Sequence, residues 1–297
     1  SWTSISSGIP TGAYTRVVRE DTTRKNLLFA GTELGIYISW NGGKQWQSFQ
    51  LNLPIVPIAD LKVSHDDLSI ATMGRSFWIL DDLGLIRQFE GNETPFVLFQ
   101  PEDAVIGNWK SQLNSNSDTF LGTDDSQGVN PANGVVFYYY LPTVIKDAAL
   151  TLLIKDKDGN LVRAISSKKD PNYLKYPGGP SPEPILSNKV GLNRFVWDMR
   201  HTSIPGMPTA YIEGSFRGHK AMPNTYTGAL KQGGKSSEAS FNIVSNPLYT
   251  ITKEQYKETH DFRTKTETNI TDMHMRVNTL KKVQSQIAII LNDLSKE

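Results

Sequence analysis

Short stretches of alternating apolar and polar residues, separated by turn residues, fill the first ninety positions of the chain. Eight such stretches form two sets of four, at residues 14–19, 26–31, 35–40 and 45–51, then 58–64, 68–72, 76–81 and 85–89. Shifting the sequence by 40 residues places Thr32 on Thr72 and Tyr37 on Phe77. Four strands in each unit of ~40–45 residues are typical of β-propeller blades. The pattern therefore predicts about two propeller blades over residues 1–90.

A region poor in apolar residues follows, and it predicts a linker or long loop over residues 91–133. Alternation then returns in six short runs, at residues 135–141, 148–155, 161–165, 193–199, 225–230 and 241–244. The stretch Asp158-Gly159-Asn160 supplies a tight turn between the second and third runs. Short strands of this kind, without a blade period, predict an immunoglobulin-like β-sandwich over residues 134–246.

The last region, residues 247–297, contains neither glycine nor proline after Pro247 and predicts a helical tail on a chain that is otherwise mostly β. Thr252 with Gln255 three positions later forms a capping box, which marks a helix start. Apolar residues then recur at coiled-coil spacing, at Met273, Val277, Leu280, Ile287, Leu291 and Leu294. The threonine-rich stretch 264–272 is weak helix sequence, so the tail is either one long helix or a helical hairpin. Because residues 252–262 offer few large apolar partners, the seam predicts self-association between chains.

Composition and charge narrow the classes of partner. Hydrophobic residues make up 38% and charged residues 21% of the chain, as in ordinary globular proteins. The net charge of +1 gives no field that would attract nucleic acid or an anionic membrane. No apolar run approaches the ~18 residues of a membrane span. The absence of cysteine excludes disulfides, thiolate zinc sites and a cysteine nucleophile. Because the chain opens with Ser1-Trp2, we expect it to be the C-terminal piece of a longer protein.

Residues 39–46 match the Asp-box pattern Ser-x-Asp-x-Gly-x-x-Trp, with asparagine in the aspartate position. The matching residues are Ser39, Asn41, Gly43 and Trp46. These residue types predict a hairpin turn in which the Asn41 side chain accepts backbone N–H groups, glycine adopts a positive φ, and tryptophan covers the turn. We therefore expect the Asp box to be structural.

Three further segments carry a family resemblance: Gly-Thr-Glu-Leu-Gly-Ile-Tyr at 31–37, Pro-Ile-Ala-Asp-Leu at 57–61, and Ala-Thr-Met-Gly-Arg-Ser-Phe-Trp-Ile-Leu-Asp-Asp at 71–82. Together with the Asp box, they resemble the Asp-box (BNR) repeat propellers of the sortilin-like superfamily, in the bacterial branch described as glycosyl hydrolases. The resemblance implies a propeller, an immunoglobulin-like module matched at 191–200 and 223–226, and a helical end. It also implies export from a bacterial cell. The chain departs from the family pattern at Asn41 and at Met73, where histidine is frequent.

Few residues are candidates for catalysis. Glu33, Asp60, Arg75 and Asp81 are the polar residues that best suit glycoside hydrolysis, which needs two carboxylates about 5–9.5 Å apart. Glu33 and Asp60 would serve equally well as turn caps or as partners of an arginine. Asp81 and its neighbour Asp82 would point to opposite sides of a strand, so they are a poor pair.

Metal and cofactor motifs are not recognised in the sequence. His65 beside two aspartates is interpreted as a solvated turn, and His201, His219, His260 and His274 lack the spacing of a metal motif. The prediction is a non-catalytic binding or scaffold fragment of an exported propeller protein, with a glycan or a protein as ligand and without a metal or cofactor. The alternative is part of a sialidase-like glycosyl hydrolase whose catalytic residues lie mostly in N-terminal blades outside the chain.

Overall fold

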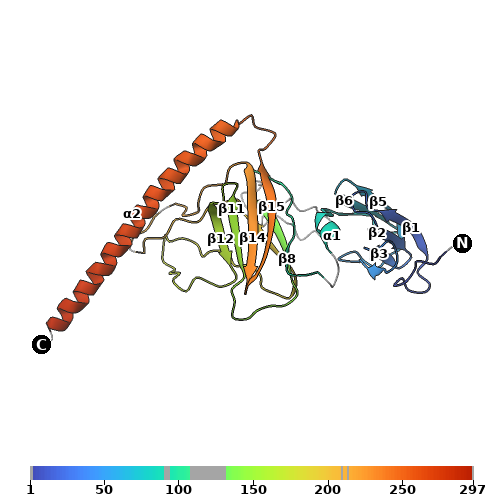
Figure 1. The fold of residues 1–297 in the computed structure, drawn as a ribbon, viewed down its shortest axis with the longest axis horizontal. Helices are drawn as coiled ribbons and strands as arrows, with labels where there is room; N and C mark the ends of the chain where they lie inside the picture. The colour runs from blue at the N-terminus through green and yellow to red at the C-terminus, as the bar shows by residue number, and fades with distance from the viewer. Residues whose placement is uncertain (1–2, 90–93, 108–131, 209, 213, 296–297) are drawn as a thin grey trace. The chain divides into compact units, whose positions relative to one another are not determined.

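The computed structural model describes residues 3–89, 94–107, 132–208, 210–212 and 214–295. Over these residues the chain is mostly β, with 15 strands and a long C-terminal helix (Figure 1), which confirms the predicted class of fold. The chain divides into two compact units, Ser1–Thr94 and Pro95–Glu297. Most of the predicted linker, residues 91–133, lies outside the described residues.

The first unit contains two antiparallel sheets that share one apolar core. One sheet has the order β1-β2-β3-β4, formed by Thr15–Glu20, Leu28–Thr32, Gly35–Ser39 and Gln47–Ser48. The other has the order β5-β6-β7, formed by Ile58–Ser64, Asp67–Thr72 and Phe77–Leu80. Phe29 and Ile38 from the first sheet and Leu61 and Leu68 from the second are buried in the shared core. Seven of the predicted stretches therefore form strands, each paired with its neighbour along the chain.

The eighth predicted strand, at residues 85–89, is wrong, because Gly84–Gln88 forms the short helix α1. Leu83 is buried in the core and Ile86 packs against it. A separation of three residues places both side chains on one face of a helical turn, whereas in a strand they would point to opposite faces. The Asp82 carboxylate accepts the Gly84 backbone N–H at 2.9 Å and closes the turn before α1.

The second unit begins with two sheets. The smaller sheet has the order β13-β10-β8, formed by Gly191–Trp197, Val135–Leu141 and Val97–Leu98. The larger sheet has the order β12-β11-β14-β15-β9, formed by Leu161–Ser166, Thr151–Asp156, Asn224–Gln232, Lys235–Val244 and Ala104–Val105. Neighbouring strands are antiparallel except β15 and β9, which are parallel.

Aromatic side chains from both sheets meet in the core of the second unit. Every second residue of β10 is buried, as its alternating sequence predicts. Phe137 from the smaller sheet meets Phe241 from the larger one with ring centroids 5.3 Å apart, and Trp197 meets Tyr226 at 6.1 Å. Both pairs are edge-to-face, a favourable arrangement of the ring quadrupoles. The two sheets are therefore joined through their inner faces.

The connection from β13 to β14 forms an irregular antiparallel pair of segments, residues 199–204 and 216–221, which we call the ladder. The backbone N–H of Ala221 donates to the Met199 carbonyl, and that of His201 donates to the His219 carbonyl. The pairing continues in the same register to Ile204, which donates to the Phe216 carbonyl. Directly opposite residues of an antiparallel pair carry their side chains on the same side. The ladder therefore places His201 beside His219.

Lys253–Leu294 forms one unbroken helix, α2, of 42 residues (Figure 1). The predicted capping box of Thr252 and Gln255 is confirmed. Of the two predicted alternatives for the tail, the single helix is correct, and residues 264–272 contain no break. The Thr268 hydroxyl donates to the carbonyl four residues earlier at 2.9 Å, so this threonine side chain bonds to the helix it belongs to. Among the described residues, no helix is long and apolar enough to cross a membrane.

Candidate functional site

Two of the candidate residues for catalysis, Glu33 and Asp60, have separate arginine partners on β1. Arg16 Nε donates to Glu33 Oε1 at 2.8 Å, and Arg19 Nη2 donates to Asp60 Oδ1 at 2.8 Å. Both pairs are exposed to solvent. The geometry therefore fits the arginine-partner interpretation of both residues.

The other two candidates, Arg75 and Asp81, lie just before and just after β7 and are exposed. Trp78 Nε1 donates to the Arg75 carbonyl at 2.8 Å, which uses the backbone of Arg75 and not its guanidinium. Within the described part of the first unit, no hydrogen bond or ion pair joins any two of the four candidates.

The Asp box forms a closed turn between β3 and β4. Asn41 Oδ1 accepts the Gln45 backbone N–H at 2.9 Å, and Ser39 Oγ accepts that of Gly43 at 2.9 Å. Gly43 has a φ of 85°, in the region that favours glycine. Trp46 is 3% exposed, and its indole N–H donates to a backbone carbonyl at 2.6 Å. The residues of the box hold the turn together, and Asn41 supplies the acceptor oxygen that the pattern assigns to aspartate.

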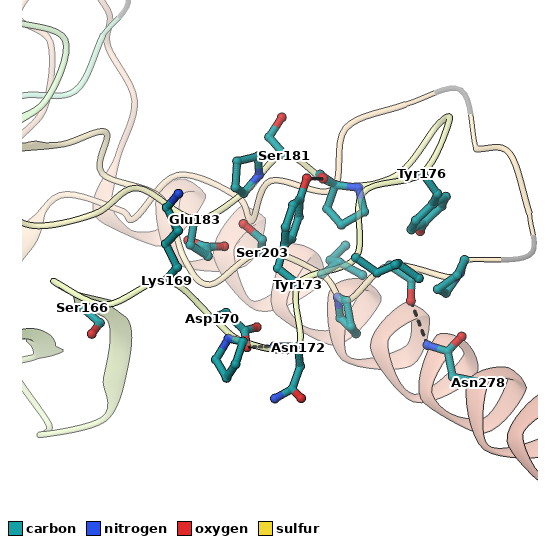
Figure 2. A pocket seen from close by; sticks show the side chains of 18 of the residues that line it. Ser166, Lys169, Asp170, Asn172, Tyr173, Tyr176, Ser181, Glu183, Ser203 and Asn278 are labelled. Carbon is teal, nitrogen blue, oxygen red and sulfur yellow. Dashed lines mark hydrogen bonds between the residues drawn. The ribbon is translucent and has the colours of Figure 1, made fainter. Parts of the chain in front are cut away.

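A cleft of about 1310 Å³ lies in the second unit (Figure 2). Most of its lining comes from the proline-rich loop 168–185, from residues 203–208, and from the α2 residues between 278 and 285. The Asn278 amide donates to the Gly206 carbonyl at 2.8 Å and ties α2 to this loop region. Small-molecule pockets commonly measure ~300–1,000 Å³. The cleft therefore has room for an extended ligand.

Rings form the walls of this cleft. The Tyr173 hydroxyl donates to the Pro180 carbonyl at 3.1 Å, and the Tyr176 hydroxyl accepts the Met207 backbone N–H at 2.6 Å. Because both hydroxyls are bonded to the backbone, the two rings are held in place beside the cleft (Figure 2). Prolines complete the apolar surface, at Pro171, Pro180, Pro182, Pro184, Pro205 and Pro208.

The charged groups of the cleft are mainly cationic, with four lysines and two carboxylates in the lining. Among the described residues, Lys169, Lys281 and Lys282 have no hydrogen-bond or ion-pair partner. One of the two carboxylates, Glu183, is already paired with the buried Arg163. The cleft therefore favours a ligand that carries negative charge.

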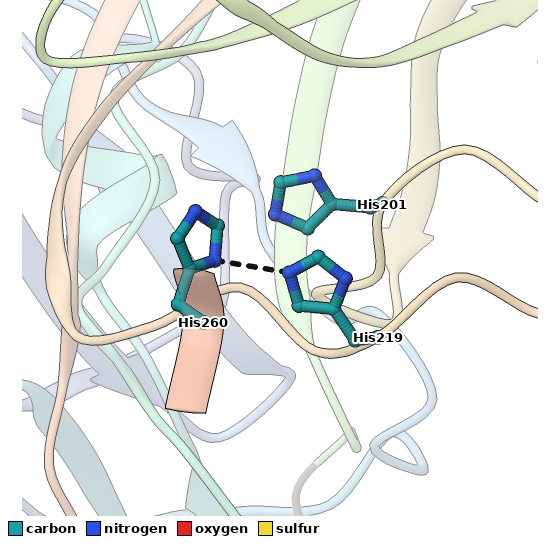
Figure 3. Close-up of side chains that lie close together, drawn as sticks. All are labelled: His201, His219 and His260. Carbon is teal, nitrogen blue, oxygen red and sulfur yellow. Dashed lines mark hydrogen bonds between the residues drawn. The ribbon is translucent and has the colours of Figure 1, made fainter. Parts of the chain in front are cut away.

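Three histidines from separate segments of the second unit meet at one point (Figure 3). His201 and His219 face each other across the ladder, and their rings stack with centroids 4.1 Å apart. His260 lies in the first half of α2, and its Nδ1 is 2.9 Å from Nε2 of His219. One nitrogen of each ring lies within 4.8 Å of those of the other two. These atoms could serve as ligands of a metal ion.

Burial favours the neutral form of two of these imidazoles. It lowers the pKa of His201 to about 3, and the neighbouring His219 and His260 act in the same direction. Burial is also the main cause that lowers the pKa of His260, followed by the neighbouring His219. A neutral imidazole keeps a lone pair that can bind a metal.

No short-range spacing in the sequence marks this cluster, because His201 and His219 become neighbours only through the ladder. A signal does exist along α2. His260, Thr264, Glu267, His274 and Asn278 are separated by three, four or seven residues, which places them on one face of the helix. Each of them bonds to the β13–β14 connection, so this polar face of α2 packs against that connection.

Comparison of the chain with models of known families, with curated proteins and with solved structures finds no match. A functional assignment therefore rests on the described geometry and on the resemblance in the sequence.

Proposed function

We propose that this chain is a non-catalytic binding module that holds a negatively charged glycan in the cleft of its second unit. The observation that carries the proposal is the combination of ring walls and unpaired lysines around one cleft. Sugar rings pack their C–H faces on flat apolar groups, and carboxylate or sulfate substituents bind cationic side chains. Tyr173 and Tyr176 offer the first kind of surface, and Lys169, Lys281 and Lys282 offer the second.

The Asp-box resemblance supports an extracellular setting for this module. In this proposal the two sheets of the first unit are propeller blades of a sortilin-like protein, and the sandwich of the second unit is the immunoglobulin-like domain that follows them. Export from a bacterial cell would bring the cleft into contact with glycans. The glycosyl hydrolase alternative has less support among the described residues, because Glu33 and Asp60 each pair with an arginine of β1.

Helix α2 supports a second role, as a surface through which two chains associate. Leu280 is 68% exposed, Ile287 51% and Leu291 61%. A large apolar side chain left in water forgoes roughly 1.5–3 kcal/mol relative to burial. Heptad spacing suits a second copy of the same helix. We therefore propose pairing through the predicted seam, formed by Met273, Val277, Leu280, Ile287, Leu291 and Leu294.

Calorimetric titration of the chain tests the proposed ligand. A hexamer of galacturonic acid should bind, with an affinity that falls as salt is added, and a neutral galactose hexamer should not. Lys282→Gln should weaken binding about tenfold, the equivalent of ~1.4 kcal/mol. Lys265→Gln, which removes an exposed lysine of α2 outside the cleft, should leave it unchanged. Equal binding of the neutral sugar, or binding of a hexaglutamate peptide in place of the acidic sugar, would contradict the proposal.

Sedimentation velocity tests the self-association surface. The chain should form a dimer, and Ile287→Glu should shift it to the monomer. Gln286→Glu introduces the same charge at the adjacent position outside the seam and should leave the dimer intact. A parent chain that sediments as a monomer at all concentrations would contradict this role.

A further inference from the structure

We infer that His201, His219 and His260 bind one zinc ion, and that this ion fastens α2 to the ladder. The site goes beyond the proposed glycan binding, since none of the three histidines lines the cleft. Zinc holds imidazole nitrogens at ~2.0–2.1 Å, so in a tetrahedral site the nitrogens lie about 3.3–3.5 Å apart. His219 Nε2 and His260 Nδ1 are 2.9 Å apart, and one nitrogen of each ring lies within 4.8 Å of those of the other two. The spacing in a zinc site falls between these two values.

An unpaired nitrogen distinguishes a metal site from a simple network of histidines. His201 Nε2 is buried and has no hydrogen-bond partner among the described residues. Buried polar atoms in folded proteins are nearly always bonded, so this nitrogen requires an explanation. Hydrogen bonding between His219 and His260 leaves it without a partner. A bound ion would use its lone pair once the His201 ring, which stacks on that of His219, turns to direct the lone pair at the ion (Figure 3).

Glu267 orients His219 in the way that metal ligands are usually oriented. Its Oε2 lies 2.7 Å from Nδ1 of His219, and its Oε1 accepts the His219 backbone N–H at 2.7 Å. With a proton on Nδ1 directed at the carboxylate, Nε2 presents its lone pair to the other two histidines. Histidines that bind metals commonly donate their second ring N–H to a carboxylate in this manner. Glu267 is therefore a positioning residue of the site.

The donor set favours zinc and a structural role for it. Imidazole nitrogens suit Zn²⁺ and related transition metals, whereas Mg²⁺ and Ca²⁺ prefer oxygen ligands. The three histidines line neither the cleft nor a second, smaller cavity of the second unit, whose walls include residues 179–184 and 214–217. Two of the ligands come from the ladder and one from α2, so the ion joins the helix to the sandwich. Thr264, one turn after His260, has its hydroxyl oxygen 3.5 Å from His219 Nε2 and lies beside the proposed ion.

Zinc titration of the full chain, produced without an affinity tag and stripped with a chelator, tests this site. Competition with a chromogenic chelator should give one Zn²⁺ per chain, and Co²⁺ should give the visible absorption of a tetrahedral site. Mg²⁺ should not compete. His260→Gln should weaken zinc binding at least about a hundredfold, and Glu267→Gln about 10–100-fold. His65→Gln, which alters an exposed histidine of the first unit, is the control and should bind zinc as the parent does.

A measurement on the parent chain avoids any dependence on the folding of variants. Zinc should slow amide hydrogen exchange in α2 residues 253–270 and raise the melting temperature of the second unit, since a ligand that binds only the folded state stabilises it. A parent that binds no zinc, or equal zinc binding by the His260→Gln and His65→Gln variants, would overturn the site. Zinc bound at one equivalent without any change of exchange in α2 would overturn its fastening role.

Discussion

The ion pair of Asp21 and Arg87 in the first unit predicts a large loss of stability when it is broken. The Asp21 side chain is 0% exposed and that of Arg87 is 11% exposed. Arg87 Nε lies 3.1 Å from both carboxylate oxygens, and the backbone N–H groups of Thr23 and Arg24 donate to Oδ1 at 2.9 and 2.5 Å. Removing one partner of a buried ion pair costs ~3–5 kcal/mol. Asp21→Asn keeps the shape and some hydrogen bonds, so we expect a loss of ~2–4 kcal/mol.

The contribution of Asp21 should depend on pH. Burial alone would raise the pKa of this carboxyl, but hydrogen bonds from Arg87 and from the backbone of Arg24 and Thr23 outweigh it and hold the pKa below its usual value of 3.8. A group whose pKa is lower in the folded state stabilises the fold above its unfolded pKa and loses that effect as pH falls through the folded value. The contribution is therefore complete at neutral pH and declines below about pH 4.

Denaturant unfolding of the full chain, with hydrogen exchange of residues 84–89 as a local probe, measures this loss. Asp66→Asn is the matched control, because Asp66 also pairs with Arg87 but its side chain is 65% exposed. An exposed partner of this kind should contribute less than ~1 kcal/mol. Equal losses of stability in Asp21→Asn and Asp66→Asn, or a difference between Asp21→Asn and the parent that does not shrink in acid, would refute the role of the buried pair.

Three other outcomes follow from the described contacts. Trp46→Ala should destabilise the first unit by ~3–5 kcal/mol in thermal unfolding, because the indole covers the Asp-box turn. An unchanged thermal unfolding curve would contradict this packing. Tyr139→Phe should lower the free energy of unfolding in denaturant by ~1–2 kcal/mol, because the Tyr139 hydroxyl donates to the Ser187 carbonyl at 2.6 Å. An unchanged free energy of unfolding would show that water replaces this bond. The chain should not hydrolyse fluorogenic glycosides or sialosides, and turnover abolished by Glu33→Gln or Asp60→Asn would disprove the non-catalytic assignment.

Local features of the fold could be predicted from the sequence because their causes are local. Alternation along residues 135–141 reflects burial of one face of β10, and the capping box at Thr252 satisfies the first N–H groups of α2 with nearby side chains. The prediction of a strand at residues 85–89 is wrong because a short apolar run fits the two-residue period of a strand as well as the 3.6-residue period of a helix. The packing of Leu83 and Ile86 favours the helix. Tertiary contacts decide such cases.

The histidine cluster could not be predicted, because its geometry depends on contacts between distant segments. The ladder pairs His201 with His219, and α2 supplies His260 only because its polar face packs on this connection. The apolar seam of α2, for which the sequence predicts self-association, is not covered within the described chain, since Leu280 and Ile287 are more than half exposed. Among the described residues, the polar side of the helix makes the contacts with the β13–β14 connection, and the apolar seam is exposed.

We propose that the chain binds an anionic glycan in the cleft of its second unit without cleaving it. Hydrogen exchange of the chain with and without the galacturonic acid hexamer, combined with analysis of the recovered sugar, tests both parts at once. We expect slower exchange confined to the segments that contribute to the cleft, residues 168–185, 203–208 and 278–285, and recovery of the intact hexamer. Protection elsewhere without protection of these segments, or the appearance of shorter sugars, would contradict it.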